Sequence, residues 1–323
     1  MRLREFTLRD IAAIADIRNA SVSISPDFYA MTVDRFRCDF YGEGQPAQSR
    51  IVVAENEQLE VVGFYHLYTD EHLLRTGRVD LDSLHVRPDI RSAGIGALLL
   101  THACTTAREW GAGRVSIAIP ESSTRSMAFL TRQGFEAVCT FEKTRVNLSG
   151  TDFAPPVLPP EQGIRHFAVG VDETAFIKLF NECFSKLWNF SELTVKELTD
   201  WNHRANFDPE GCFLLFENDV LIGFSTVLKT EEMIENRSAP IGRIFELGVI
   251  PQKRQSGAGF ILLQQALHYA AAQGLQAVDL VTEASHDGGR QLFRKLGEHP
   301  VRRTIVLHRS IETMQFPKRF VDG

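Results

Sequence analysis

Apolar residues along this chain recur at helical spacing in some segments and at strand spacing in others. In residues 8–20, Ile11, Ile14 and Ile17 fall on one side of a helix of 3.6 residues per turn, which predicts an amphipathic helix. Residues 51–55 and 61–67 are short runs rich in valine and aromatic residues on either side of a polar turn, which is typical of a hairpin. Helical and strand segments therefore alternate, and they do so in the same order twice.

The pattern predicts the following elements for the first half: a helix at 8–20, strands at 51–55, 61–67 and 78–86, a helix at 94–110, a strand at 115–119, a short helix at 127–133 and closing strands within 135–148. For the second half it predicts a helix at 173–184, strands at 212–216, 220–228 and 243–250, a helix at 257–273, a strand at 277–281, a short helix at 290–296 and a closing strand at 301–308. Each half is therefore expected to be an α/β fold, a mixed sheet covered by helices.

The two halves are an internal repeat with a constant spacing of 163 residues. The repeated positions are Pro88, Gly94, Gly96, Gly111 and Gly134, which return as Pro251, Gly257, Gly259, Gly274 and Gly297. A constant offset over such a length implies the same order of elements in both copies.

A proline-rich stretch at 153–160 separates the copies. Proline fixes φ and lacks an N–H donor, so this stretch can form neither a helix nor a central strand and is expected to be a stiff linker. We place the break near residue 155, which predicts an N-terminal domain at 1–152, a linker at 153–162 and a C-terminal domain at 163–323.

Composition and charge argue against several classes of protein, among them nucleic-acid-binding, metal-binding and membrane proteins. The formal net charge of −6 argues against a nucleic-acid-binding chain. The five scattered cysteines include no Cys-x-x-Cys, which favours reduced thiols and gives no support to a metal site. No apolar run approaches the length that spans a bilayer, and the charged amino terminus is unlike a signal peptide. A cytoplasmic protein with no membrane partner is the expectation.

The repeated segment with the clearest chemistry is a strand end, a proline, a basic turn and Arg-x-x-Gly-x-Gly leading into a helix. Glycine lets the backbone approach a ligand closely, and the free N–H groups at a helix start attract phosphate. Leu99 and Leu262 stand where a dinucleotide-binding Gly-x-Gly-x-x-Gly loop has its third glycine, and no Gly-Lys-Ser/Thr follows. The pattern predicts a pyrophosphate site in each half; the alternative is an ordinary tight turn.

These loops are where the chain resembles the GNAT family of N-acetyltransferases, as two consecutive domains. The Leu-x-Val-x-Pro-x-x-Arg-x-x-Gly-x-Gly segment looks like that family's coenzyme-A-binding segment, and Gly134-Phe135 matches the end of its downstream helix. The resemblance implies acetyl-CoA as co-substrate and a mixed, mostly antiparallel sheet in each domain. The positions that it assigns to the coenzyme are Leu84, His85, Val86, Arg91, Ser92, Ala93, Gly94, Ile95 and Gly96, and in the second half Leu247, Gly248, Val249, Arg254, Gln255, Ser256, Gly257, Ala258 and Gly259.

The two catalytic candidates are carboxylates on the strands that lead into the loops. Glu246 could orient an amine or take its proton, and its alternative reading is a salt bridge at a strand end. Asp82 falls at an acidic position of the family pattern, and its alternative is the solvent-facing side of a half-exposed strand. His85 lies between Leu84 and Val86, where strand alternation predicts a packed or surface histidine rather than a base.

The tyrosine that protonates the departing thiolate in many family members is missing. Leu130 and Phe293 occupy its place, and neither can donate a proton. Ser123, Ser126 or His286 could substitute, or water could do so.

Tyr29 and Trp188 belong to aromatic clusters that follow the first helix of each half, where the resemblance places the acceptor pocket. The expected activity is acetyl transfer from acetyl-CoA to the amine of a small molecule by direct attack, with the second half favoured as the catalyst. The alternatives are a non-catalytic acyl-CoA-binding or sensor protein and an acyltransferase for peptide amino termini. The expected assembly is a monomer, in which the halves form a pseudo-dimer, or a homodimer.

Overall fold

The computed structural model describes residues 1–22, 30–34, 36, 48–150, 153–188, 190–203, 207–234, 237–296 and 300–311. Contacts between Cα atoms divide the chain into two compact units. Unit 1 comprises Met1–Val138 with Ile305–Gly323, and unit 2 comprises Cys139–Thr304.

Unit 1 is a sheet in the order β1-β2-β3-β4-β5, followed by the part of β12 that begins at Ile305. From β1 to β4 neighbouring strands are antiparallel, and β4 and β5 run parallel. Its elements are β1 (Arg2–Glu5), η1 (Leu8–Asp10), α1 (Ile11–Val22), β2 (Gln48–Glu55), β3 (Val61–Thr69), α3 (Glu71–Arg75), β4 (Arg78–Val86), η2 (Pro88–Ile90), α4 (Ile95–Glu109), β5 (Arg114–Pro120) and α5 (Thr124–Arg132).

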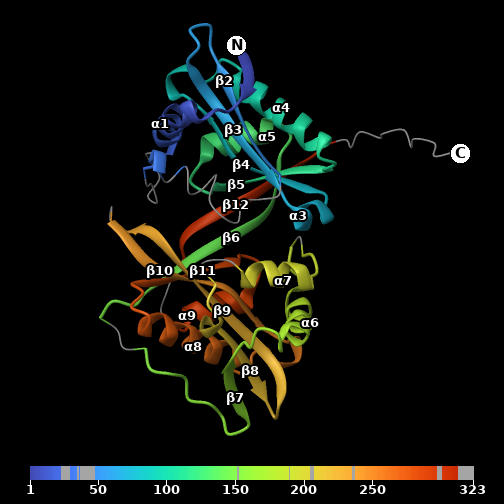
Figure 1. Ribbon diagram of the computed structural model, residues 1–323, viewed down its shortest axis with the longest axis vertical. Coiled ribbons are helices and arrows are strands. Elements are labelled where there is room, and N and C mark those ends of the chain that lie inside the picture. The colour runs from blue at the N-terminus through green and yellow to red at the C-terminus, as the bar shows by residue number, and fades with distance from the viewer. Residues whose placement is uncertain are drawn as a thin grey trace, which may run out of the picture. The chain divides into compact units, whose positions relative to one another are not determined.

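Helices cover both faces of the unit 1 sheet (Figure 1). On one face α4 packs its buried Leu99, Leu100 and Ala103 against alternate strand residues such as Tyr65 and Leu67. The other face carries α1 in a smaller apolar cluster that includes Phe64. Successive strand residues point to opposite faces, so the two faces can carry different chemistry.

Unit 2 repeats this arrangement, with its strands in the order β6-β11-β10-β9-β8-β7 and one parallel pair, β10 with β11. Helix α8 covers one face, and α6 and α7 cover the other (Figure 1). Its elements are β6 (Glu136–Asn147, from Cys139), β7 (Gln162–His166), α6 (Glu173–Phe184), α7 (Val195–Asn202), η3 (Pro209–Gly211), β8 (Cys212–Glu217), β9 (Val220–Ile234), β10 (Arg237–Val249), η4 (Pro251–Lys253), α8 (Ala258–Ala272), β11 (Ala277–Glu283), α9 (Asp287–Arg294) and β12 (Pro300–Ser310, to Thr304).

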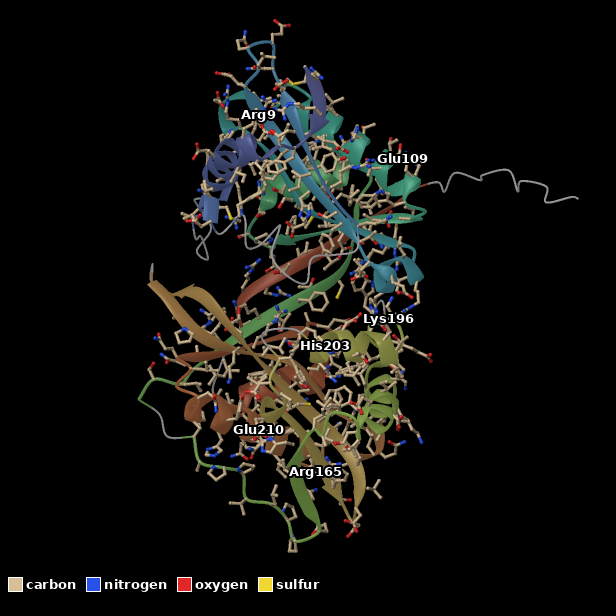
Figure 2. All side chains as sticks on the ribbon, viewed as in Figure 1. Arg9, Glu109, Arg165, Lys196, His203 and Glu210 are labelled. Carbon is tan, nitrogen blue, oxygen red and sulfur yellow. The ribbon has the colours of Figure 1, made fainter. Side chains whose placement is uncertain are left out.

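A duplicated ion pair ties the first strand of each unit to the start of its first helix. The Arg4 guanidinium donates to both oxygens of buried Asp10 at 2.7 and 2.9 Å. Arg165, labelled on β7 in Figure 2, does the same to Asp172 at 2.6 and 2.7 Å. Such charged bidentate pairs fix geometry as well as adding stability.

The fold predicted from the repeat is confirmed, since both units are mixed, mostly antiparallel sheets flanked by helices. Helices α3 and α7 were not predicted. The closing strands differ from expectation in where they pack: residues 141–147 pair with β11 in unit 2, and Leu307 is buried in the core of unit 1. A repeated apolar pattern specifies a strand but not its partner, because both sheets offer the same edge chemistry. The domain boundaries proposed from the linker stay a prediction.

Within the part of the chain that the structure describes, no helix is long and apolar enough to cross a membrane, and no three His, Cys, Asp or Glu side chains are grouped as metal ligands. Cys104, Cys139, Cys183 and Cys212 are buried free thiols.

Candidate acyl-transfer sites

In each Arg-x-x-Gly-x-Gly segment the first glycine has a left-handed backbone and immediately precedes a helix, and the second glycine lies in the first turn of that helix. Gly94 precedes α4 with φ of 82°, and Gly257 precedes α8 with φ of 97°. A Cβ added at either glycine would meet no heavy atom within 4 Å, so both turns open onto free space. The first backbone N–H groups of each helix lack acceptors within the helix. In α8 the N–H of Ala258 lies 3.4 Å from the Ser256 hydroxyl, its acceptor in the turn. Both loops therefore fit a phosphate group bound at a helix N-terminus.

The loop arginine, which occurs at the same position in both copies of the repeat, donates hydrogen bonds within the protein. Arg91 donates to the carbonyl of Val86 at 3.2 Å and to the Ser21 hydroxyl at 3.0 Å. Arg254 donates to the carbonyl of Val249 at 3.2 Å and to that of Cys183 at 2.8 Å. Each guanidinium thus ties the strand end and the loop to the first helix of its unit, and any contact with phosphate stays a prediction.

Beside each loop, the two parallel strands separate. Pairing of β4 with β5 ends at Asp80 and Ser116, although β4 continues to Val86. Pairing of β10 with β11 ends at Ile244 and Leu280, although β10 continues to Val249. The strand ends at Leu84, Val86, Leu247 and Val249 therefore border a gap that can admit an extended ligand arm.

A β-bulge marks the point of separation in both units, and it sets the two carboxylates in different places. In unit 1 the extra residue is Asp82, and Ser83 pairs with His66 on β3. In unit 2 the extra residue is Phe245, and Glu246 takes the pairing position, opposite Thr226 on β9. The acidic side chain has moved by one residue between the copies.

Glu246 is a partly buried carboxyl group on the face of the sheet that carries α6 and α7. Burial raises its pKa to about 8, although the nearby Arg243 charge acts in the opposite direction. Among the described residues, none donates a hydrogen bond to its side chain or forms an ion pair with it. A carboxylate that becomes charged near neutral pH is suited to accept a proton from an amine.

Asp82 differs from Glu246 in exposure and in partners. About half of its side chain is exposed, with an accessible fraction of 48%. It accepts a hydrogen bond from the Ser83 hydroxyl at 2.8 Å and lies 3.4 Å from His66 Nδ1. Although burial works against the charge, these contacts lower the pKa of Asp82. Asp82 is therefore charged at neutral pH and, unlike Glu246, does not change its protonation state near pH 7.

His85 and Gly248 occupy equivalent places on the loop-bearing strands. The His85 ring lies 5.4 Å from that of Phe64, and burial together with the charges of Arg18 and Arg91 lowers its pKa to about 4. A Cβ at Gly248 would approach the Phe224 ring to 2.6 Å, so only glycine fits there. The His85 ring packs against Phe64 in its neutral form, and contact of this residue with the coenzyme stays a prediction.

The positions of the missing tyrosine are apolar and buried. Leu130 on α5 is 1% exposed and Phe293 on α9 is 3% exposed. His286 precedes α9, and its Nδ1 accepts the backbone N–H of Gly289 at 3.3 Å, which leaves the proton on Nε2. Burial and the charge of Arg254 lower its pKa.

A narrow aromatic cavity lies on the Glu246 face of unit 2. Thr226 and Phe245, the partner and the chain neighbour of Glu246, both line it. Trp201 of α7 packs edge-on against Phe245 with ring centroids 5.2 Å apart. The other lining residues are Phe167, Phe176, Leu198, Asn202, Phe207, Cys212 and Leu228. The sequence pattern singled out Tyr29 and Trp188 but missed Phe245 and Thr226, because strand pairing and the bulge decide which side chains line this cavity.

Tyr29, the other aromatic candidate, lies outside the described residues. The backbone N–H of Trp188 donates to Glu283 at 3.3 Å.

Comparison with known proteins gives one family. The model described as the acetyltransferase (GNAT) family matches residues 14–135 and again residues 174–297. A mycothiol acetyltransferase of Amycolatopsis mediterranei is 29% identical over 244 residues, which cover 74% of this chain and 77% of that protein. One from Thermobifida fusca is 29% identical over 239 residues, covering 68% and 72%.

Solved structures show the same fold over nearly the whole chain. An N-acetyltransferase of this family from Sphaerobacter thermophilus superposes with a TM-score of 0.78 at 20% identity, covering 96% of this chain and 95% of that one. A tandem GNAT protein from the clavulanic acid biosynthesis pathway superposes with a TM-score of 0.68 at 15% identity, covering 96% and 98%.

Proposed function

Because this chain belongs to the acetyltransferase (GNAT) family in both of its halves, we propose that it moves the acetyl group of acetyl-CoA to the amine of a small molecule by direct attack. GNAT acetyltransferases use acetyl-CoA as co-substrate, and the glycine turns before α4 and α8 support binding of its pyrophosphate at these helix starts. The observation that carries the proposal is Glu246, a carboxyl group with a pKa of about 8 at the point where β10 and β11 separate.

The residues of unit 2 can be given roles on this proposal. The helix start at Gly257 and Ala258 holds the pyrophosphate, and the edge of β10 at Leu247 and Val249, which no longer pairs with β11, holds the pantetheine arm. Glu246 accepts the proton of the amine, directly or through a water. The amine nitrogen bonds to the thioester carbon, the carbon–sulfur bond breaks, and the thiolate takes a proton from water or from His286 Nε2–H.

The acceptor is proposed to be a small molecule with an apolar part beside its amine. The relatives named above are mycothiol acetyltransferases, which act on a small molecule by their name. In this chain the cavity lined by Phe245, the chain neighbour of Glu246, is aromatic and also includes Trp201 and Phe207. Aromatic side chains bind apolar groups and orient them by ring contacts.

Coenzyme binding is tested with a matched pair of glycine variants. Gly257→Val places a side chain where the phosphate is expected, whereas Gly274→Val imposes the same backbone strain after α8, away from the loop. Titration of acetyl-CoA by calorimetry should give at least a tenfold weaker affinity for Gly257→Val than for Gly274→Val, since a lost charged hydrogen bond costs about 1.5–3 kcal/mol. Equal affinities of the two variants would remove unit 2 as the coenzyme site.

A second function, a non-catalytic acyl-CoA-binding protein, is favoured by Leu130 and Phe293, which fill both positions of the expected proton donor. Thiol release measured over a panel of aromatic and aliphatic amines separates the two functions. Binding of acetyl-CoA without release of coenzyme A from any amine would replace the first proposal by the second.

A further inference from the structure

Three side chains on neighbouring strands of unit 1 form a hydrogen-bonded chain that the acetyl-transfer proposal does not use. The Ser49 hydroxyl on β2 lies 2.9 Å from Nε2 of His66 on β3. The other ring nitrogen, Nδ1, lies 3.4 Å from Oδ2 of Asp82, the bulge residue of β4. A serine, a histidine and an aspartate thus meet in the order and through the atoms that a nucleophilic serine requires.

The sheet places these side chains on one face. Ser49 and His66 lie two residues from Ile51 and Phe64, which pack in the α1 cluster, so all four point to that side. The bulge at Asp82 turns its carboxylate to the partner strand, where it meets the imidazole. Tyr68 adds a ring contact to His66 at 5.7 Å between centroids.

The hydrogen bonds determine the tautomer of His66. An ionised carboxylate can only accept, and the contacts of Asp82 favour its charged form, so Nδ1 of His66 carries the proton. In the neutral imidazole, Nε2 then faces Ser49 with its lone pair and can take the hydroxyl proton. His66 is 5% exposed, whereas Ser49 is exposed, so the base is enclosed and the nucleophile is accessible.

The second unit serves as an internal comparison. By strand register, Thr226 stands where unit 1 has His66, and Phe245 stands where it has Asp82. Unit 2 therefore carries the same fold with none of this chain of groups, so the fold itself does not require it.

We propose that Ser49 is an activated nucleophile and that unit 1 hydrolyses small acyl esters or thioesters through it. Ser49 Oγ bonds to the acyl carbon while His66 Nε2 takes its proton. The bond to the alcohol or thiol breaks, and that group leaves with the proton from His66. Water, deprotonated by His66, then releases the acid and restores the serine, so that the net reaction is ester plus water to acid plus alcohol or thiol.

The test uses the full chain and two probes that do not involve acetyl-CoA. A fluorophosphonate reporter should label the wild-type protein once, at Ser49, as read by mass spectrometry of the peptides. p-Nitrophenyl acetate should be hydrolysed, and Ser49→Ala should abolish both signals. Asp82→Asn, an exposed change that leaves the fold intact, should slow labelling at least tenfold, and His66→Asn should slow it at least a hundredfold, because triad members act as a unit.

Ser310→Ala is the matched control, since Ser310 is an exposed serine at the end of a strand and makes none of these contacts. It should label and hydrolyse at wild-type rates. Glu246→Gln should do the same, which separates this activity from the acetyl-transfer proposal. A wild-type chain that remains unlabelled, or Asp82→Asn labelling at the wild-type rate, would overturn the proposal even if acetyl transfer is found.

Discussion

Replacing Glu246 by glutamine removes a charge while keeping the side-chain shape, and it should affect stability and rate in opposite directions. The folded-state pKa of about 8 compares with an ordinary value of 4.5. At about 1.4 kcal/mol per pH unit, holding this carboxylate charged in the folded protein costs up to about 5 kcal/mol above pH 8.

The sign follows from proton binding. Between pH 4.5 and 8 the folded protein keeps the proton of Glu246 and the unfolded chain has lost it, so wild-type stability falls as pH rises. Glu246→Gln has no ionisable group at this position, so its stability does not fall with pH for this reason. The variant should match the wild type near pH 5 and be the more stable of the two by several kcal/mol at pH 9.

The assay is denaturant unfolding at pH 5, 7 and 9. Trp188 and Trp201 are the tryptophans of unit 2, so a Trp110→Phe background lets fluorescence report on that unit. Glu161→Gln, an exposed carboxyl group of the same unit, is the control and should show no pH-dependent difference.

Kinetics complete this prediction. Wild-type kcat/KM for an amine acceptor should rise with pH through an ionisation near 8, and Glu246→Gln should lower the rate by about 10²–10⁴-fold, the usual contribution of a general base. Equal pH dependence of stability in variant and wild type would refute the reasoning about burial. An unchanged rate would refute the role as base.

Three further outcomes are expected. Arg254→Ala should weaken acetyl-CoA binding by tenfold or more in a calorimetric titration, because the loop loses the hydrogen bonds to the carbonyls of Val249 and Cys183. An unchanged affinity would show that these two hydrogen bonds are not needed for coenzyme binding. Trp201→Ala should raise KM for an aromatic amine and leave KM for acetyl-CoA unchanged, and the reverse pattern would place the acceptor elsewhere. Asp172→Asn should destabilise unit 2 by about 1.5–3 kcal/mol at pH 7. Its hydrogen bonds from Arg165 lower the pKa of Asp172, so the difference should shrink as pH falls below 4, and a constant gap in denaturant titrations would contradict this.

The sequence by itself determined most of the helices and strands and the two Arg-x-x-Gly-x-Gly turns that precede α4 and α8. Local spacing specifies these features, because helix and strand periods, a proline stop and a glycine before a helix act within a few residues. The repeat doubled each signal, and it led to the correct fold class and to Gly94 and Gly257 at the left-handed turns.

Tertiary structure decided which side chains meet. Along the chain Asp82 and Glu246 are each a carboxylate on a loop-bearing strand, but the bulges put Asp82 against His66 and leave Glu246, without a partner among the described residues, next to two residues that line an aromatic cavity. Ser49 and His66 lie 17 residues apart, and no periodicity joins them. Pairing of strands, the extra residue of a bulge and the burial that raises the pKa of Glu246 arise from contacts distant in sequence, so only the folded chain could reveal them.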